Sequence, residues 1–128
     1  MLADDARYSD PTMIYFDRPA IDLSGADAIV AFWRSASEES GTSSIQYNVK
    51  KCFETAGYYV VHLEIAVGLA GAFWNVAKDS ITVEGGVTSV IRIRDGKIVE
   101  HDDYVDYAGA LRFIDQLRNQ YGAADPAS

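Results

Sequence analysis

The chain has 128 residues, of which 48% are hydrophobic and 23% charged, and this balance indicates one globular domain with its own core rather than a disordered chain. Its formal net charge of −8, with no Lys or Arg cluster to offset it, excludes nucleic acid and anionic membrane surfaces as partners. No membrane span or signal peptide is visible and the single cysteine precludes an internal disulfide, so we expect a cytoplasmic protein.

The first helix is expected to begin after Ser24, which can cap it, with Asp27 completing a capping-box pattern. It is expected to end at Ser40-Gly41. Apolar side chains recur on one face of this helix, at Ile29, Phe32, Trp33 and Ala36.

Long strands with alternating side chains follow. Residues 45–49 and 59–67 form two of them around an Ala56-Gly57 turn, and Gly68 to Gly71 break or bend the second. Its apolar face is expected to point inward, which leaves His62 and Glu64 outside, near Arg92 and Arg94.

A third strand is expected over residues 80–94, with a bulge at Gly85-Gly86 that curves the sheet. Asp95-Gly96 is the strongest hairpin signal. A two-residue turn there sets Val90 opposite His101, and one extra loop residue would place Ser89 there instead.

The last helix is expected after Asp106 as its cap and ends at Gly122. Its apolar face carries Ala110, Phe113, Ile114, Leu117 and Tyr121. Residues 1–122 therefore form a single α+β domain, in which helices cover one face of a curved antiparallel sheet, and 123–128 form a frayed tail. Two helices cannot fill so long a bent sheet, so we expect a cavity for an apolar small molecule.

Three segments resemble the NTF2-like superfamily, most closely its SnoaL-like branch and the related ketosteroid isomerases and limonene-epoxide hydrolases. These segments are LADDARYSDP, the helix after Gly25 and GKIVEHDDYVDYAGALRFIDQL. The resemblance implies a cone-shaped sheet around helices, a ligand in its open end, a homodimer through the outer sheet face and no cofactor. It also implies isomerisation, ring closure or epoxide opening by acid/base chemistry, although some members only bind or scaffold.

Members usually carry a long helix before the ADDA segment, and here Met1 stands almost at that segment. The lid of the cone is then absent, supplied by another element, or outside the chain as given. Family residues that lie on that helix, including the isomerases' phenolic oxyanion donor, are therefore not carried over to this chain.

Asp103 matches the aspartate that acts as acid or base in SnoaL-like cyclases and epoxide hydrolases. Strand alternation places His101 on the same face, where burial would raise the carboxyl pKa and the imidazole would lower it. Asp10, before Pro11, matches the isomerases' general base, and Asp-Pro is also a common turn dipeptide.

Ser89 stands where the isomerases have an oxyanion-donating aspartate, so its hydroxyl is a weaker candidate donor. Val105 shares a face with Asp103. Aromatic side chains are expected at the pocket mouth, at Tyr8, Tyr15, Phe16, Trp33 and Trp74. His62, His101 and Cys52 lack metal-ligand spacing, so no metal is expected.

Two hypotheses result. The first is a cofactor-independent enzyme in which Asp103 moves a proton on an apolar cyclic compound, His101 tunes it and Asp10 is a second carboxylate. The rival is a non-catalytic ligand-binding or dimerisation domain on the same fold.

Overall fold

The computed structural model describes residues 1–124, within which six strands form one sheet. The expected tail, 123–128, lies mostly outside this range, so the domain bounds stay a prediction. No helix in the described part is both long and apolar enough to cross a membrane. The elements are β1 (Leu2–Asp10), η1 (Pro11–Phe16), β2 (Ile21–Ser24), α1 (Ala26–Ser40), β3 (Ser44–Thr55), β4 (Tyr58–Ala70), η2 (Ala72–Trp74), β5 (Ser80–Arg94), β6 (Lys97–Val105) and α2 (Tyr107–Tyr121).

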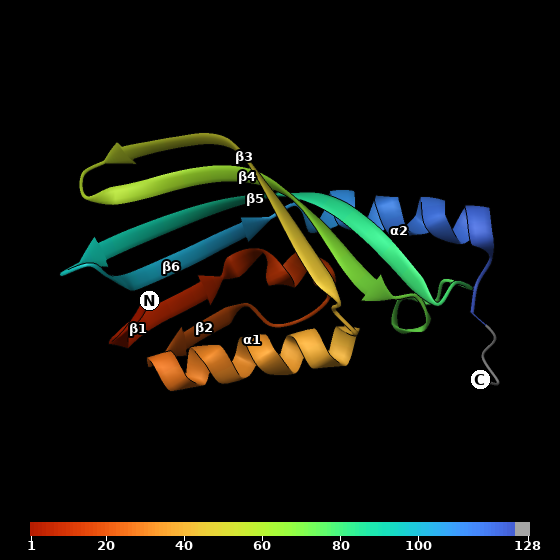
Figure 1. Cartoon of the computed structure of the whole chain (residues 1–128), viewed down its shortest axis with the longest axis horizontal. Helices are drawn as coiled ribbons and strands as arrows, with labels where there is room; N and C mark the ends of the chain where they lie inside the picture. Colours follow the sequence, from red (N-terminus) through yellow and green to blue (C-terminus); the bar gives the residue numbers. More distant parts are fainter. Residues whose placement is uncertain (125–128) are drawn as a thin grey trace.

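The fold is α+β, as expected, with a strongly curved sheet in the strand order β2-β1-β6-β5-β4-β3. Every neighbouring pair is antiparallel except β1 and β6, which run parallel, so the sheet is mixed. The two strands are far apart in the chain, so no hairpin dictates their relative direction. In Figure 1, β3, β4 and β5 bend sharply and α1 lies beside β1 and β2. Helix α2 lies along the N-terminal half of β5.

The bulge expected at Gly85-Gly86 is absent. β4 and β5 stay in register there, with Ile65 opposite Gly85 and Glu64 opposite Gly86. The irregularities lie in β3, between Val49 and Lys51, in the β1–β6 pairing, between Leu2 and Arg7, and in the β5–β6 pairing, where Val99 is the extra residue. Glycine pairs permit a bulge but do not require one, because a continuous strand can also contain them.

The Asp95-Gly96 hairpin is confirmed, and its two residues have φ values of 53° and 75°, as a type I′ turn requires. Beyond it, the extra residue Val99 shifts the pairing by one. Ile91 therefore lies opposite His101 and Ser89 lies opposite Asp103, so both registers expected from the turn are wrong. The shift arises inside β6, where the length of the turn gives no information.

The helix ends differ in how well they were predicted. Ser24 does not cap α1, because it is the last residue of β2 and pairs with Arg7. The N-cap is Gly25, with a φ of 96° and no side-chain hydrogen bond. For α2, the Asp106 carboxylate accepts a 2.9 Å hydrogen bond from the Gly109 amide, and the helix stops before Gly122.

His62 and Glu64 are exposed, as predicted, but Arg92 and Arg94 are not their partners. Register places His62 opposite Thr88, with its Nδ1 atom 3.0 Å from the threonine hydroxyl oxygen. The Lys50 Nζ atom lies 3.7 Å from a Glu64 carboxylate oxygen.

The buried apolar side chains form two clusters. One gathers under α2 and includes Leu69, Val83 and Ile114, and the other lies under α1 and includes Ala6 and Ile29. Since each helix covers its own part of the sheet, the space between the clusters is left for a cavity.

Candidate active site

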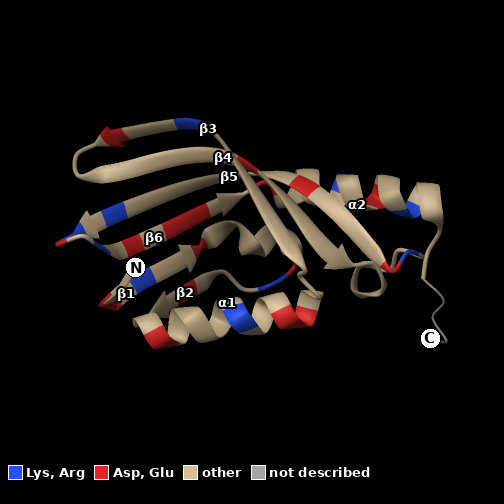
Figure 2. Ribbon diagram, in the orientation of Figure 1, with Lys and Arg blue, Asp and Glu red and all other residues tan. Residues whose placement is uncertain are grey.

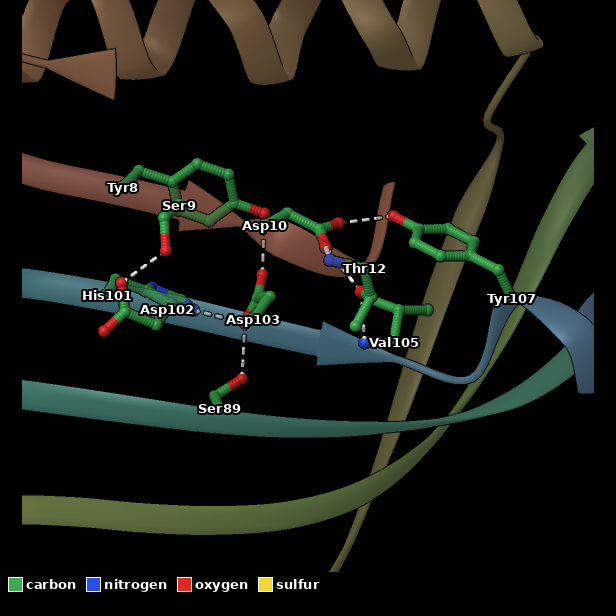
Figure 3. A network of polar contacts seen from close by, with 10 residues as sticks. All are labelled: Tyr8, Ser9, Asp10, Thr12, Ser89, His101, Asp102, Asp103, Val105 and Tyr107. Carbon is green, nitrogen blue, oxygen red and sulfur yellow. Dashed lines mark hydrogen bonds and ion pairs between the residues drawn. The ribbon is translucent and has the colours of Figure 1, made fainter. Parts of the chain in front are cut away.

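A polar network joins β1, β5 and β6 on the sheet face that α1 covers (Figure 3). The Asp103 carboxylate lies at its centre. One oxygen, Oδ1, accepts hydrogen bonds from Ser89 Oγ at 2.6 Å and His101 Nε2 at 2.7 Å, and the other, Oδ2, accepts one from the Tyr8 hydroxyl at 2.8 Å. Since the carboxylate can only accept, His101 Nε2 carries a proton.

Burial by itself would raise the pKa of Asp103, but hydrogen bonds from His101, Ser89 and Tyr8 and the imidazole charge outweigh burial and lower it below its usual value. Asp103 is therefore ionised at neutral pH. Burial and the Asp103 charge raise the pKa of Tyr8, which keeps its phenol protonated. The side chains of Asp103 and His101 each remain 19% exposed.

The lowered pKa of Asp103 predicts a specific dependence of stability on pH. Its charge stabilises the fold above the unfolded-state pKa, and this contribution is lost as the pH falls through the lower folded-state pKa. We expect the advantage of wild type over Asp103→Asn in unfolding free energy to shrink as the pH falls below about 4, the ordinary pKa of an aspartate. Urea unfolding across this range measures it, and a constant advantage would contradict the assignment.

Asp10 forms a second buried carboxylate, with 1% of its surface exposed. As the N-cap of η1, its Oδ1 atom accepts hydrogen bonds from the Thr12 amide at 3.0 Å and the Thr12 hydroxyl at 2.5 Å. Its Oδ2 atom accepts a 2.5 Å hydrogen bond from the Tyr107 hydroxyl. The Thr12 hydroxyl oxygen also accepts a bond from the Val105 amide, so Asp10 is tied to the end of β6.

An apolar cavity of about 480 Å³ lies between α1, α2, η1, η2 and the sheet. Its volume is in the range of small-molecule sites. Of the residues predicted from the sequence, Phe16, Trp74 and Val105 line it. Asp103, His101 and Ser89 do not line it. Val105, two residues beyond Asp103 at the end of β6, is the wall residue of that strand.

The remaining predicted aromatic residues are placed elsewhere. Tyr15 is 68% exposed and does not line the cavity. Trp33 packs edge-on against Tyr8, with ring centres 5.2 Å apart, and near His101. Tyr8 and Trp33 therefore belong to the polar network and its packing, whereas Phe16 and Trp74 belong to the cavity.

Two residues of the site were not predicted from the sequence, Tyr107, which lines the cavity, and Thr12. For Thr12 a signal was present, because Asp10 followed by Pro11 is a helix-start pattern in which the residue two beyond the cap donates to it. Tyr107 had no such signal, because its partner lies 97 residues away.

Charged residues are dispersed along the described part of the chain (Figure 2). The residues that line the cavity are largely apolar. Charged residues of the wall, including Arg18, Glu39 and Glu84, are exposed. In residues 1–124 no three His, Cys, Asp or Glu side chains form a group that could hold a metal ion.

Known structures share this fold. A SnoaL-like protein from Shewanella putrefaciens CN-32 has a TM-score of 0.74 and 16% identity, over 88% of this chain and 78% of that one. A protein with a ketosteroid-isomerase-like fold from Catenulispora acidiphila DSM 44928 has a TM-score of 0.68 and 14% identity, over 89% and 76%. An LEH-like epoxide hydrolase from M. tuberculosis has a TM-score of 0.66 and 15% identity, over 91% and 73%.

No curated protein matches the chain at a significant level. The family model described as SnoaL-like polyketide cyclase matches residues 2–114, which include both carboxylates and all the residues that line the cavity. This match covers most of the chain and agrees with the shared fold. The chain belongs to the SnoaL-like polyketide cyclase family.

Proposed function

We propose that this protein is a cofactor-independent acid/base enzyme that acts on an apolar cyclic compound. The observation that carries the proposal is an apolar cavity of about 480 Å³ with two largely buried carboxylates, Asp103 and Asp10, at the strand end that borders it. An apolar site holds a ring compound by burial of its surface, and a carboxylate beside it supplies the proton transfer.

In this proposal Asp103 is the proton shuttle. As an ionised carboxylate it accepts a proton from a substrate carbon beside a ketone, and it returns that proton to another carbon of the same molecule. The same carboxylate could instead take a proton from a water molecule that opens an epoxide. His101, Ser89 and Tyr8 hold the carboxylate in one orientation, and Asp10 is a second carboxylate, which is hydrogen-bonded to the wall residue Tyr107.

Ligand binding tests the cavity directly. We expect 1-tetralone, a steroid ketone or limonene oxide to raise the melting temperature, since a ligand at about 100 times its Kd adds about 2.7 kcal/mol to the stability. Ala36→Trp, which fills the cavity from α1, should raise the Kd of the ligand at least about tenfold and so reduce the rise in melting temperature. Ala31→Trp is the matched control, because Ala31 is on the same helix but outside the cavity wall. Equal loss in both variants would argue against binding in this cavity.

A second candidate is a non-catalytic ligand-binding or dimerisation domain. It is favoured by the position of Asp103 outside the cavity wall and by exposed apolar side chains on the outer sheet face, where Phe53 is 50% and Tyr104 is 44% exposed. A homodimer through that face would cover both. Sedimentation analysis checks the dimer, and ligand binding without turnover of any bound compound would favour this candidate. The cytoplasmic location also stays a prediction.

A further inference from the structure

Tyr107 connects the buried carboxylate Asp10 to the cavity. Its side chain lines the cavity wall, whereas Asp10 is 1% exposed and does not line it. The phenol hydroxyl donates to Asp10 Oδ2 at 2.5 Å. Tyr107 therefore links the cavity wall to this carboxylate.

Both ends of this contact are fixed. The Tyr107 ring lies against Phe16, with centres 5.5 Å apart, and Phe16 in turn contacts Trp74 at 5.2 Å. The other Asp10 oxygen is occupied by the amide and hydroxyl of Thr12. This packing and these hydrogen bonds support the orientation in which the Tyr107 hydroxyl donates to Asp10.

A phenol has one proton to donate and lone pairs to accept with. Because the proton of Tyr107 is used by Asp10, only its lone pairs remain for a ligand. We infer that Tyr107 is the residue that hydrogen-bonds the ligand, that Asp10 is the positioning residue behind it, and that the cavity therefore selects an apolar ring compound with a hydroxyl group over the matching ketone. This inference rests on the proposed function, because it requires a ligand in the cavity.

Some of the other polar groups of the wall already have partners within the protein. Arg18 and Glu39 form an exposed ion pair with a 3.8 Å separation. Ser40 donates to the Ala36 carbonyl oxygen inside its own helix. Burial and the nearby Asp10 carboxylate also raise the pKa of the Tyr107 phenol, so it remains protonated in neutral solution.

The test compares 1-tetralol with 1-tetralone, two ring compounds of nearly equal size, by isothermal titration calorimetry. Only the alcohol can donate to Tyr107. We expect wild type to bind the alcohol about 3- to 10-fold more tightly, the range that one net hydrogen bond supplies. Tyr107→Phe should reduce this ratio to about one, because the acceptor is gone.

Asp10→Asn gives a result that a merely structural role would not produce. The amide oxygen of Asn can keep the bonds from Thr12, which places the amide nitrogen opposite Tyr107 as a donor. Tyr107 then accepts that bond and its own proton becomes free for the ligand. The ketone should therefore bind several-fold more tightly to Asp10→Asn than to wild type.

Tyr15→Phe is the control, since Tyr15 is exposed and lies outside the cavity wall. It should keep the wild-type preference. Equal binding of the two compounds by wild type, or a preference that survives in Tyr107→Phe, would overturn the inference while leaving the cavity as a ligand site. If neither these compounds nor the steroid ketone and limonene oxide bind wild type, the proposed function fails instead. Thermal unfolding establishes whether each variant is folded. If Asp10→Asn does not fold, the comparison of alcohol and ketone binding by wild type still tests the inference.

Discussion

Replacing Asp103 by Asn is expected to lower kcat on a turned-over substrate by about 100- to 10,000-fold, the usual contribution of a general acid or base. The substitution keeps the size of the side chain and an oxygen that can accept from Ser89 or His101, but an amide cannot take up the proton. Substrate binding should change little by comparison. Steady-state kinetics on a compound identified by the binding screen measures both effects.

Asp102→Asn is the matched control for this experiment. Asp102 is the preceding residue, and its carboxylate accepts a 2.5 Å hydrogen bond from Ser9, on the opposite face of the sheet (Figure 3). The same chemical change there should leave kcat within about twofold, because the Asp102 carboxylate lies on the other face of the sheet from Asp103. If the two variants lose activity equally, or if Asp103→Asn loses none, Asp103 is not the proton shuttle.

Gly71→Ala is expected to have a large effect on stability. The added Cβ would lie 1.8 Å from the Lys78 carbonyl oxygen, a backbone atom that cannot move aside by rotation. Gly71 also organises the turn before η2, because its carbonyl oxygen accepts hydrogen bonds from the Trp74 and Val76 amides. We expect a loss of about 2–3 kcal/mol in unfolding free energy, as for an overpacked buried site, measured by urea unfolding.

The same substitution should also weaken ligand binding, because Phe73 and Trp74 of η2 line the cavity. Gly86→Ala is its control: the nearest atom to the added Cβ would be His62 Cε1 at 3.8 Å, an ordinary contact. That variant should match wild type within about 0.5 kcal/mol. Equal stabilities of the two variants would show that the turn at Gly71 relaxes to admit a side chain.

The separation of the two carboxylates bears on the chemistry. Asp103 is surrounded by His101, Ser89 and Tyr8 and keeps a low pKa, whereas Asp10 reaches the cavity through Tyr107. The Asp103 carboxylate stays ionised and therefore suits proton transfer, whereas the Tyr107 hydroxyl stays protonated and suits ligand orientation. The kinetic effect of Asp103→Asn and the binding preference of Asp10→Asn therefore probe separate parts of one site.

Local signals in the sequence determined much of the fold. Side-chain alternation and the Asp95-Gly96 pair predicted β5 with both ends correct, because strand period and turn chemistry depend only on neighbouring residues. Asp106 and Gly122 likewise predicted the ends of α2. The motifs around Asp10 and Asp103 also predicted the family, which the match over residues 2–114 confirms.

Only the tertiary structure decided how the site is assembled. Tyr8 and Asp103 meet across 95 residues and Tyr107 and Asp10 across 97, and β1 lies parallel to β6 with no local pattern to require it. The extra residue at Val99 moves Ser89 opposite Asp103. These contacts depend on strand pairing and on a one-residue register shift, which interchanges side chains between the faces of a sheet. Neither the pairing nor the shift can be predicted from local sequence patterns, because both depend on contacts between distant segments.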